Sequence, residues 1–222
     1  MMILGTVQVI GSISPYIASY FRVPTSDVLI LLPSTVLLQT VFSPLGGKLA
    51  STVQPKLLMA FGGCLYLTGL YMASQVPRDS FRTFFVLYVG GLGSCLGFTY
   101  ILPIKLAWIA FPSKPGLVSG IAIGGFGLGV LVFNQVSSML CNPMNLQQEE
   151  FTDAQTQLTS KRFPDEVALR VPYMLKGLVL SYATIICIAM FLLWDVQGQD
   201  GDQVVGGDSE DDSDYIRDSN SD

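Results

Sequence analysis

The stretch GLVSGIAIGGFGLGVLVFNQVSSML, residues 116–140, decides the fold class of this protein. It contains no charged side chain and is rich in glycine and aliphatic residues. A hydrocarbon core about 30 Å thick is crossed by a helix of about 20 apolar residues. Only helices and closed barrels satisfy every backbone hydrogen bond in lipid. The stretch therefore predicts a transmembrane helix.

Five further stretches are apolar and long enough to cross a membrane in the same way. They cover residues 1–21, 28–47, 57–76, 83–106 and 174–194. A polar, mixed-charge loop at residues 141–172 separates the fifth and sixth stretches, and the other connections are short. We therefore predict an all-α membrane protein, with six transmembrane helices forming one bundle over residues 1–194.

Composition and charge agree with a membrane bundle that carries a polar tail. Half of the 222 residues are hydrophobic, only 13% are charged, and the mean hydropathy is +0.50. A soluble domain usually has about 25% charged residues. Residues 1–194 hold 11 Lys and Arg against 7 Asp and Glu, whereas residues 195–222 hold one Arg against 10 acidic residues. The acidic segment 195–222 has little to bury, so we expect it to be disordered.

Several function classes lack the residues that they need. The chain has no histidine, which removes the commonest metal ligand and the usual general base. The four cysteines are isolated, so we expect neither a zinc site nor another metal site. No carboxylate lies within any predicted span. We therefore predict neither an enzyme nor a nucleic-acid-binding protein, and we expect only Cys141, just after the fifth span, to be readily accessible.

Glycines in the fifth span indicate close helix contacts. Gly116, Gly120 and Gly124 follow each other at four-residue spacing, and Gly125 and Gly129 form a neighbouring line. In lipid, small residues at this spacing let helix backbones approach each other. Two interpretations follow: static packing within one bundle, or a surface across which two bundles rock.

Polar side chains inside the spans need partners or a wet surface. Asn134 and Gln135 interrupt the fifth span, and we expect them to form hydrogen bonds between helices or to help gating. Lys105 lies near the end of the fourth span. A lysine there either extends its amine to the membrane interface or attracts an anionic substrate.

The loop after the second span resembles a known motif. It reads SPLGGKLASTVQPKLL, residues 43–58. It is similar to the G-x-L-A-D-R-x-G-R-K type loop of the major facilitator superfamily. The matching positions are Gly47, Leu49, Ala50 and Lys56. Ser51, Thr52 and Gln54 depart from the motif at its acidic, arginine and second glycine positions, so the ion pair that the full motif implies is not expected here.

A second resemblance lies between the fourth and fifth spans. The segment WIAFPSKPGLVSG, residues 108–120, is similar to the WFP-[DS]-[KR]-x-G-L-[AV]-[ST]-G segment of oxalate/formate-antiporter-like and monocarboxylate-porter members. The segment SPYIASYF, residues 14–21, fits the first span of the same branch. In order and spacing the resemblance covers residues 1–194.

The resemblance implies a fold and a function. The family fold is two six-helix bundles with substrate held between them, exposed alternately to each side of the membrane. This chain would be the amino-terminal half, and its start at Met1 suggests truncation. Spans one and four would line the cavity, which makes Tyr16, Thr99, Tyr100 and Lys105 the candidate substrate contacts.

The expected function is therefore transport of a small organic anion, of monocarboxylate, oxalate or formate type, without a bound cofactor. The alternative is a non-transporting membrane subunit that keeps a half-transporter fold. Expected partners are the lipid bilayer, the anion, and a second six-helix half, a homodimer mate or a larger membrane complex. Charges in the short loops are balanced, so the cytoplasmic placement of the acidic tail rests on the resemblance, and the choice between plasma and organelle membrane stays open.

Overall fold

The computed structural model describes residues 2–152 and 159–196, and it divides into two compact units, before and after the Ile186–Cys187 bond. The packing below concerns the first unit. The described part of the second unit continues the last helix. Most of the acidic segment 195–222 lies outside the described residues. The elements are η1 (Met2–Gly5), α1 (Thr6–Phe21), α2 (Thr25–Leu29), α3 (Leu31–Thr52), α4 (Pro55–Ala73), α5 (Phe81–Thr99), α6 (Leu102–Ala110), α7 (Pro115–Cys141), β1 (Glu149–Thr152), β2 (Thr159–Arg162), α8 (Asp165–Ala168) and α9 (Val171–Val196).

The predicted fold class is confirmed. Within the described ranges, six helical stretches are long and apolar enough to cross a membrane: Met2–Phe21, Thr25–Thr52, Pro55–Ala73, Phe81–Ile109, Pro115–Cys141 and Asp165–Phe191. Each of them overlaps one of the stretches predicted from sequence, and the last begins nine residues earlier than predicted. The structure adds an antiparallel pair of short strands and a single turn of helix within the segment that was predicted to be a polar loop.

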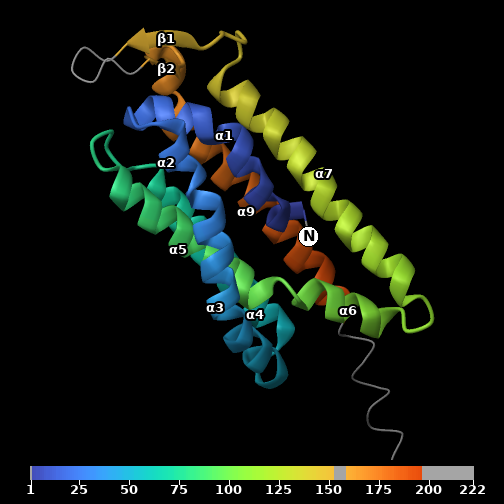
Figure 1. Ribbon diagram of the computed structural model, residues 1–222. Helices are drawn as coiled ribbons and strands as arrows, with labels where there is room; N and C mark the ends of the chain where they lie inside the picture. The colour runs from blue at the N-terminus through green and yellow to red at the C-terminus, as the bar shows by residue number, and fades with distance from the viewer. Residues whose placement is uncertain (1, 153–158, 197–222) are drawn as a thin grey trace, which may run out of the picture. The chain divides into compact units, whose positions relative to one another are not determined.

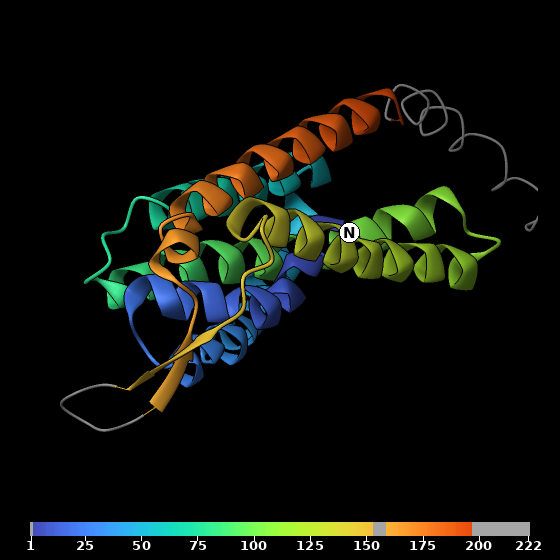
Figure 2. The same cartoon turned by 90° about the horizontal axis from the view of Figure 1, so that it is seen from above.

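Helix packing in the first unit follows a simple order (Figure 1). α5 lies between α3 and α4, and α1 packs against α7 and against the start of the α2–α3 span. α6 and α7 form a helical hairpin, visible in both views (Figure 2). α9 contacts α4 through Tyr182 and Tyr66, whose ring centroids are 5.4 Å apart, and it contacts α7 through Tyr182 and Phe133 at 4.5 Å.

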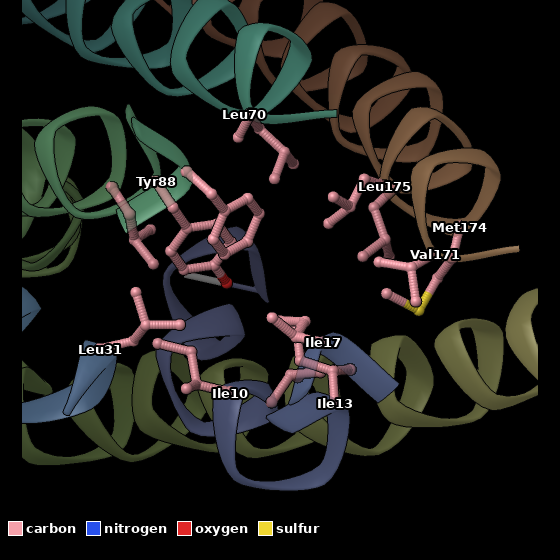
Figure 3. Packing of buried hydrophobic residues seen from close by; sticks show 14 of the residues in the cluster. Ile10, Ile13, Ile17, Leu31, Leu70, Tyr88, Val171, Met174 and Leu175 are labelled. Atoms are coloured by element: carbon pink, nitrogen blue, oxygen red, sulfur yellow. The ribbon is translucent and has the colours of Figure 1, made fainter. Parts of the chain in front are cut away.

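The apolar core is centred on α1 (Figure 3). Ile10, Ile13 and Ile17 recur on one face of this helix and are at most 1% exposed. They point toward Leu70 of α4 and Leu175 of α9, which are equally buried. The sequence spacing of the isoleucines places them on the same side of a helix. α1 is therefore the central helix of the described bundle.

Two pairs of contacts at glycines bring α3 and α4 close to α5. At Gly69 of α4, an added Cβ would lie 2.8 Å from the Cα of Gly91 in α5. At Gly46 of α3, an added Cβ would overlap the backbone of Gly97 and Phe98 in α5. These pairs bring α4 and α3 directly against α5, which is the role that small residues have between helices in lipid.

A break separates α5 from α6 at Tyr100 and Ile101. Pro103 follows the break and has no N–H to offer the carbonyl of Thr99. The amide of Tyr100 still donates to Leu96 at 2.9 Å, and that of Lys105 donates to Ile101 at 3.0 Å. The two helices therefore form one span with a kink caused by proline.

The bundle has two ends, formed by different elements. At the α8 end, α8 and the β1–β2 hairpin lie beside the last turn of α1. The α6 end is the end at which α6 is followed by the start of α7 in a helical hairpin. α7 has 27 residues and runs from the α6 end to the α8 end, a length of about 40 Å at the helical rise.

Candidate transport path

One narrow strip of α1 is left uncovered by the rest of the described residues. The first span has 61% of its most apolar stretch buried, the largest share among the six spans of the described residues. Its exposed residues are Gln8, Gly11 and Ser12, and the half-buried Pro15 and Tyr16 continue the same line. These five residues follow each other at spacings of three and four, so they occupy a single helix face. We call them the α1 strip.

The α1 strip is polar, which matters at membrane depth. The carboxamide of Gln8 and the hydroxyl of Ser12 have no hydrogen-bond partner among the described residues. A polar group facing lipid without a partner costs several kcal/mol, of order 2–7. Such a face is stable when it contacts water, a ligand or another protein segment. The α1 strip is therefore suited to line a polar path.

Tyr16 was predicted as a substrate contact, and the structure places it at one end of the α1 strip. Its ring stacks on the ring of Phe163, which follows β2, with centroids 4.6 Å apart and planes at 25°. The backbone N–H of Phe163 donates to Ser19 Oγ at 2.9 Å. Ser19 in turn donates to the carbonyl of Pro15 at 2.8 Å. The segment after β2 is thus fixed across the last turns of α1.

Charged residues surround this contact at the α8 end. Arg78, between α4 and α5, lies 3.4 Å from a carboxylate oxygen of Asp165 in α8, and its guanidinium is 5.3 Å from the ring centroid of Tyr20. Tyr20 donates its hydroxyl to the carbonyl of Val76 at 3.2 Å. Together, these three contacts join α1, the α4–α5 connection and α8.

Lys105 and Tyr100 lie at the other end of the molecule. Lys105 is exposed on α6 and pairs with no carboxylate of the described residues. Tyr100 is 42% exposed at the kink between α5 and α6. α6 is joined to the first turns of α7 by a hydrogen bond of 2.8 Å from Trp108 Nε1 to Ser119 Oγ. Tyr16 lies at the α8 end, beside Phe163, so the structure places Tyr16 and Lys105 near opposite ends of the bundle.

Thr99 lies inside the bundle and is not on an exposed surface. Its side chain is 6% exposed, and its hydroxyl donates to the carbonyl of Cys95 at 2.6 Å. Its methyl group packs where a side chain on Gly62 would stand. The hydroxyl bond is within one helix, a common alternative for threonine that sequence alone does not reveal.

The five glycines of α7 that were predicted to mediate helix contacts separate into two groups. Gly129 is buried, and an added Cβ would overlap the backbone of Met2. Gly125 is half-buried. An added Cβ would meet nothing within 4 Å at the remaining three, Gly116, Gly120 and Gly124. Within the described chain, these three therefore leave a bare helix face, available to a surface outside this bundle.

Asn134 and Gln135 are exposed on α7. No hydrogen bond joins either side chain to the described part of the chain. Any partner for the two amides therefore lies outside the described residues.

The loop motif lies at the α6 end, where α3 passes into α4. Gly47, Leu49 and Ala50 are half-buried, and so is Lys56. Ser51 donates to the carbonyl of Lys48 at 2.7 Å, and Thr52 Oγ1 lies 3.3 Å from the carbonyl of Leu49. The hydroxyls that replace the charged motif positions are thus used within their own helix.

The expectation that Cys141 is readily accessible was wrong. Its side chain is fully buried, and its thiol donates to the carbonyl of Val167 at 3.5 Å. The α8 turn covers the end of α7, a contact between segments 26 residues apart that an apolar run cannot indicate. Among the described residues, no three His, Cys, Asp or Glu side chains gather into a group that would hold a metal ion.

A central polar contact was also missed by sequence reasoning. Tyr66 of α4 donates to the hydroxyl of Thr6 in α1 at 3.2 Å, and Thr6 donates to the carbonyl of Ile3. The α1 strip was missed as well, although Gln8, Ser12 and Tyr16 show a four-residue spacing in the sequence. That spacing is the signal that could have found it.

A multi-pass bundle with an uncovered polar face is an arrangement that membrane carriers have. The comparisons agree with this class. The chain is 28% identical to Apicoplast pyruvate carrier 1 of Toxoplasma gondii over 86% of its own length. It is 36% identical to the Oxalate:formate antiporter of Oxalobacter formigenes over 40% of its length, and 34% identical to the MFS-type transporter opdF of Penicillium oxalicum over 41%.

The chain spans less than half the length of these curated relatives: 43% of the Toxoplasma carrier and 21% of each of the other two. No family model matches the chain. No solved structure matches it either. The expected resemblance is confirmed: this is an integral multi-pass membrane protein similar to major-facilitator-type carriers of the oxalate/formate branch, and its six apolar helices fit one half of such a carrier.

Proposed function

We propose that this chain forms one half of a carrier that moves a small organic anion, of monocarboxylate, oxalate or formate type, by alternating access. The α1 strip carries the proposal, because it is an uncovered polar face on the most buried span. The names of the relatives support the substrate class, since they specify pyruvate, oxalate and formate.

The proposed second wall of the path is another six-helix half that faces the α1 strip and the bare face of α7. Gly116, Gly120 and Gly124 support this placement, because each leaves open space on a helix surface. A homodimer mate or a larger membrane complex is the alternative source of that wall. The proposed orientation puts the acidic segment 195–222 in the cytoplasm.

The proposed roles of the candidate residues differ with their positions. Tyr16, with Gln8 and Ser12, contacts the anion along the α1 strip. Lys105 and Tyr100 lie at the α6 end, where an exposed ammonium group raises the local concentration of anions before they enter. Thr99 contributes to packing of α5, since its hydroxyl already has an acceptor.

A non-transporting subunit is the second candidate function. The loop between α3 and α4 favours it, because Ser51 and Thr52 bond within their own helix and leave no charged latch at these positions. Such a subunit would keep the fold for packing alone. It would show no uptake of its own in any assembly.

The test is uptake by the complete gene product in reconstituted vesicles. Labelled pyruvate, oxalate and formate are compared with glycerol as a neutral control. Saturable uptake of an anion that the other anions inhibit is expected. Correctly inserted protein that takes up none of the three anions would refute the proposal and favour the subunit.

A further inference from the structure

The segment between β2 and α8 crosses the α8 end of the α1 strip. Phe163 stacks on Tyr16, the last residue of that strip, and its backbone is bonded to Ser19 one turn further on. The hydroxyl of Ser19 has one acceptor and one donor as partners, so its geometry is fixed. The aromatic ring therefore lies where a molecule moving along Gln8, Ser12 and Tyr16 would leave the helix.

The same segment is firmly held on its other side. Val167 is 3% exposed, and its carbonyl accepts the thiol hydrogen of Cys141. Ala168 and Val171 are at most 1% exposed. The start of α9 is thus anchored in the core, and the residues before Val167 are the ones free to move without unpacking it.

One ion pair, between Arg78 and Asp165, lies between the contact of Phe163 with α1 and the anchored start of α9. Asp165 lies two residues after Phe163 and 3.4 Å from Arg78, with side chains 69% and 25% exposed. A partly exposed pair contributes only modestly to stability, so it favours one position of the segment and can still open. Pro164 lies between Phe163 and Asp165 and restricts the backbone, so a displacement of Asp165 is transmitted to Phe163.

We propose that Phe163 is a gate at the α8 end of the α1 strip, and that the Arg78–Asp165 ion pair holds this gate closed. The proposal rests on the proposed function, because it gives the α1 strip a controlled exit. In the closed state the Phe163 ring covers one face of Tyr16 and narrows the approach from the α8 end to the exposed Ser12. Loss of the ion pair lets the Phe163 ring turn away from Tyr16, while its backbone bond to Ser19 and the buried Val167 stay in place.

The test measures how fast a cysteine at position 12 is modified. Ser12→Cys is introduced into the complete gene product, and a membrane-impermeant thiol reagent is added to the face that carries the α8 end. Modification is followed for each peptide by mass spectrometry. Ser26→Cys is the access control, because Ser26 is exposed at the start of α2 and its hydroxyl bonds to the neighbouring Asp27.

We expect Phe163→Ala to raise the modification rate of Ser12→Cys several-fold, and Phe163→Tyr, which keeps the ring, to restore the slow rate. Asp165→Asn should raise the rate by a smaller factor. Glu166→Gln is the matched control: Glu166 is the neighbouring exposed carboxylate, forms no ion pair with a described residue, and should leave the rate unchanged.

Two results would overturn the gate. One is an unchanged rate at position 12 in both Phe163→Ala and Asp165→Asn. The other is a rise at position 12 that is accompanied by modification of buried Cys141, since this would mean that the whole α8 segment has come loose. The labelling does not depend on uptake, so absence of transport refutes the proposed function and leaves the labelling result interpretable.

Discussion

The contact between α4 and α5 offers a prediction whose size follows from the structure. At Gly69, an added Cβ would lie 2.8 Å from the Cα of Gly91 and 2.9 Å from the carbonyl oxygen of Leu87. Both atoms belong to the backbone of α5, so the helices must separate to admit a methyl group. At Gly90, next to Gly91 on α5, an added Cβ meets nothing within 4 Å.

Gly69→Ala and Gly90→Ala therefore make a matched pair. Both variants gain about 0.8–1.0 kcal/mol of helix propensity. Only Gly69→Ala adds overpacking, which typically costs about 1–3 kcal/mol. We expect Gly90→Ala to be as stable as the parent chain or more stable, and Gly69→Ala to be less stable than Gly90→Ala by about 1–3 kcal/mol.

The assay is thermal unfolding in detergent, with the folded fraction followed by size-exclusion chromatography after heating. For a chain of this size, a loss of 1 kcal/mol lowers the midpoint by about 2–4 °C. Equal midpoints for the two variants, or a lower one for Gly90→Ala, would refute the packing of α4 on α5.

Three further predictions concern single side chains. Tyr66→Phe removes the hydrogen bond to Thr6 and should lower stability by about 0.5–1.5 kcal/mol in the same thermal assay; an unchanged midpoint would mean that the bond does not form. Cys141 should resist an impermeant thiol reagent in the native protein and react after denaturation, because it is buried against Val167; rapid native labelling would contradict that packing. Lys105→Arg should keep the apparent affinity for a monocarboxylate in uptake assays, because an exposed cation at the α6 end acts through its charge; a large loss of affinity would instead place the lysine in direct contact with the anion.

Span positions were predictable from sequence because they follow from one physical requirement. A stretch such as 116–140 has no other stable environment than lipid, and the structure turns it into the single helix α7. The kink before α6 was equally predictable from Pro103, since a missing N–H acts locally.

Contacts between distant segments were not predictable in this way. Gly124 and Gly129 are the same residue type in one helix, and only the position of Met2 makes one packed and the other open. Tyr16 was found as a candidate because it is a polar residue on a span that, by the family resemblance, would line the cavity. Its stacking on Phe163 joins segments that are separated by most of the chain, so no local sequence pattern indicates it.

The central claim is that the α1 strip lines the path of a small organic anion. Substrate protection of Ser12→Cys in the complete gene product tests it most directly. Pyruvate or oxalate, in the range where uptake saturates, should slow thiol modification at position 12, whereas glycerol should not, and Ser26→Cys should react at the same rate throughout. Modification at position 12 that proceeds at the same rate with every anion, in protein that transports them, would contradict the claim.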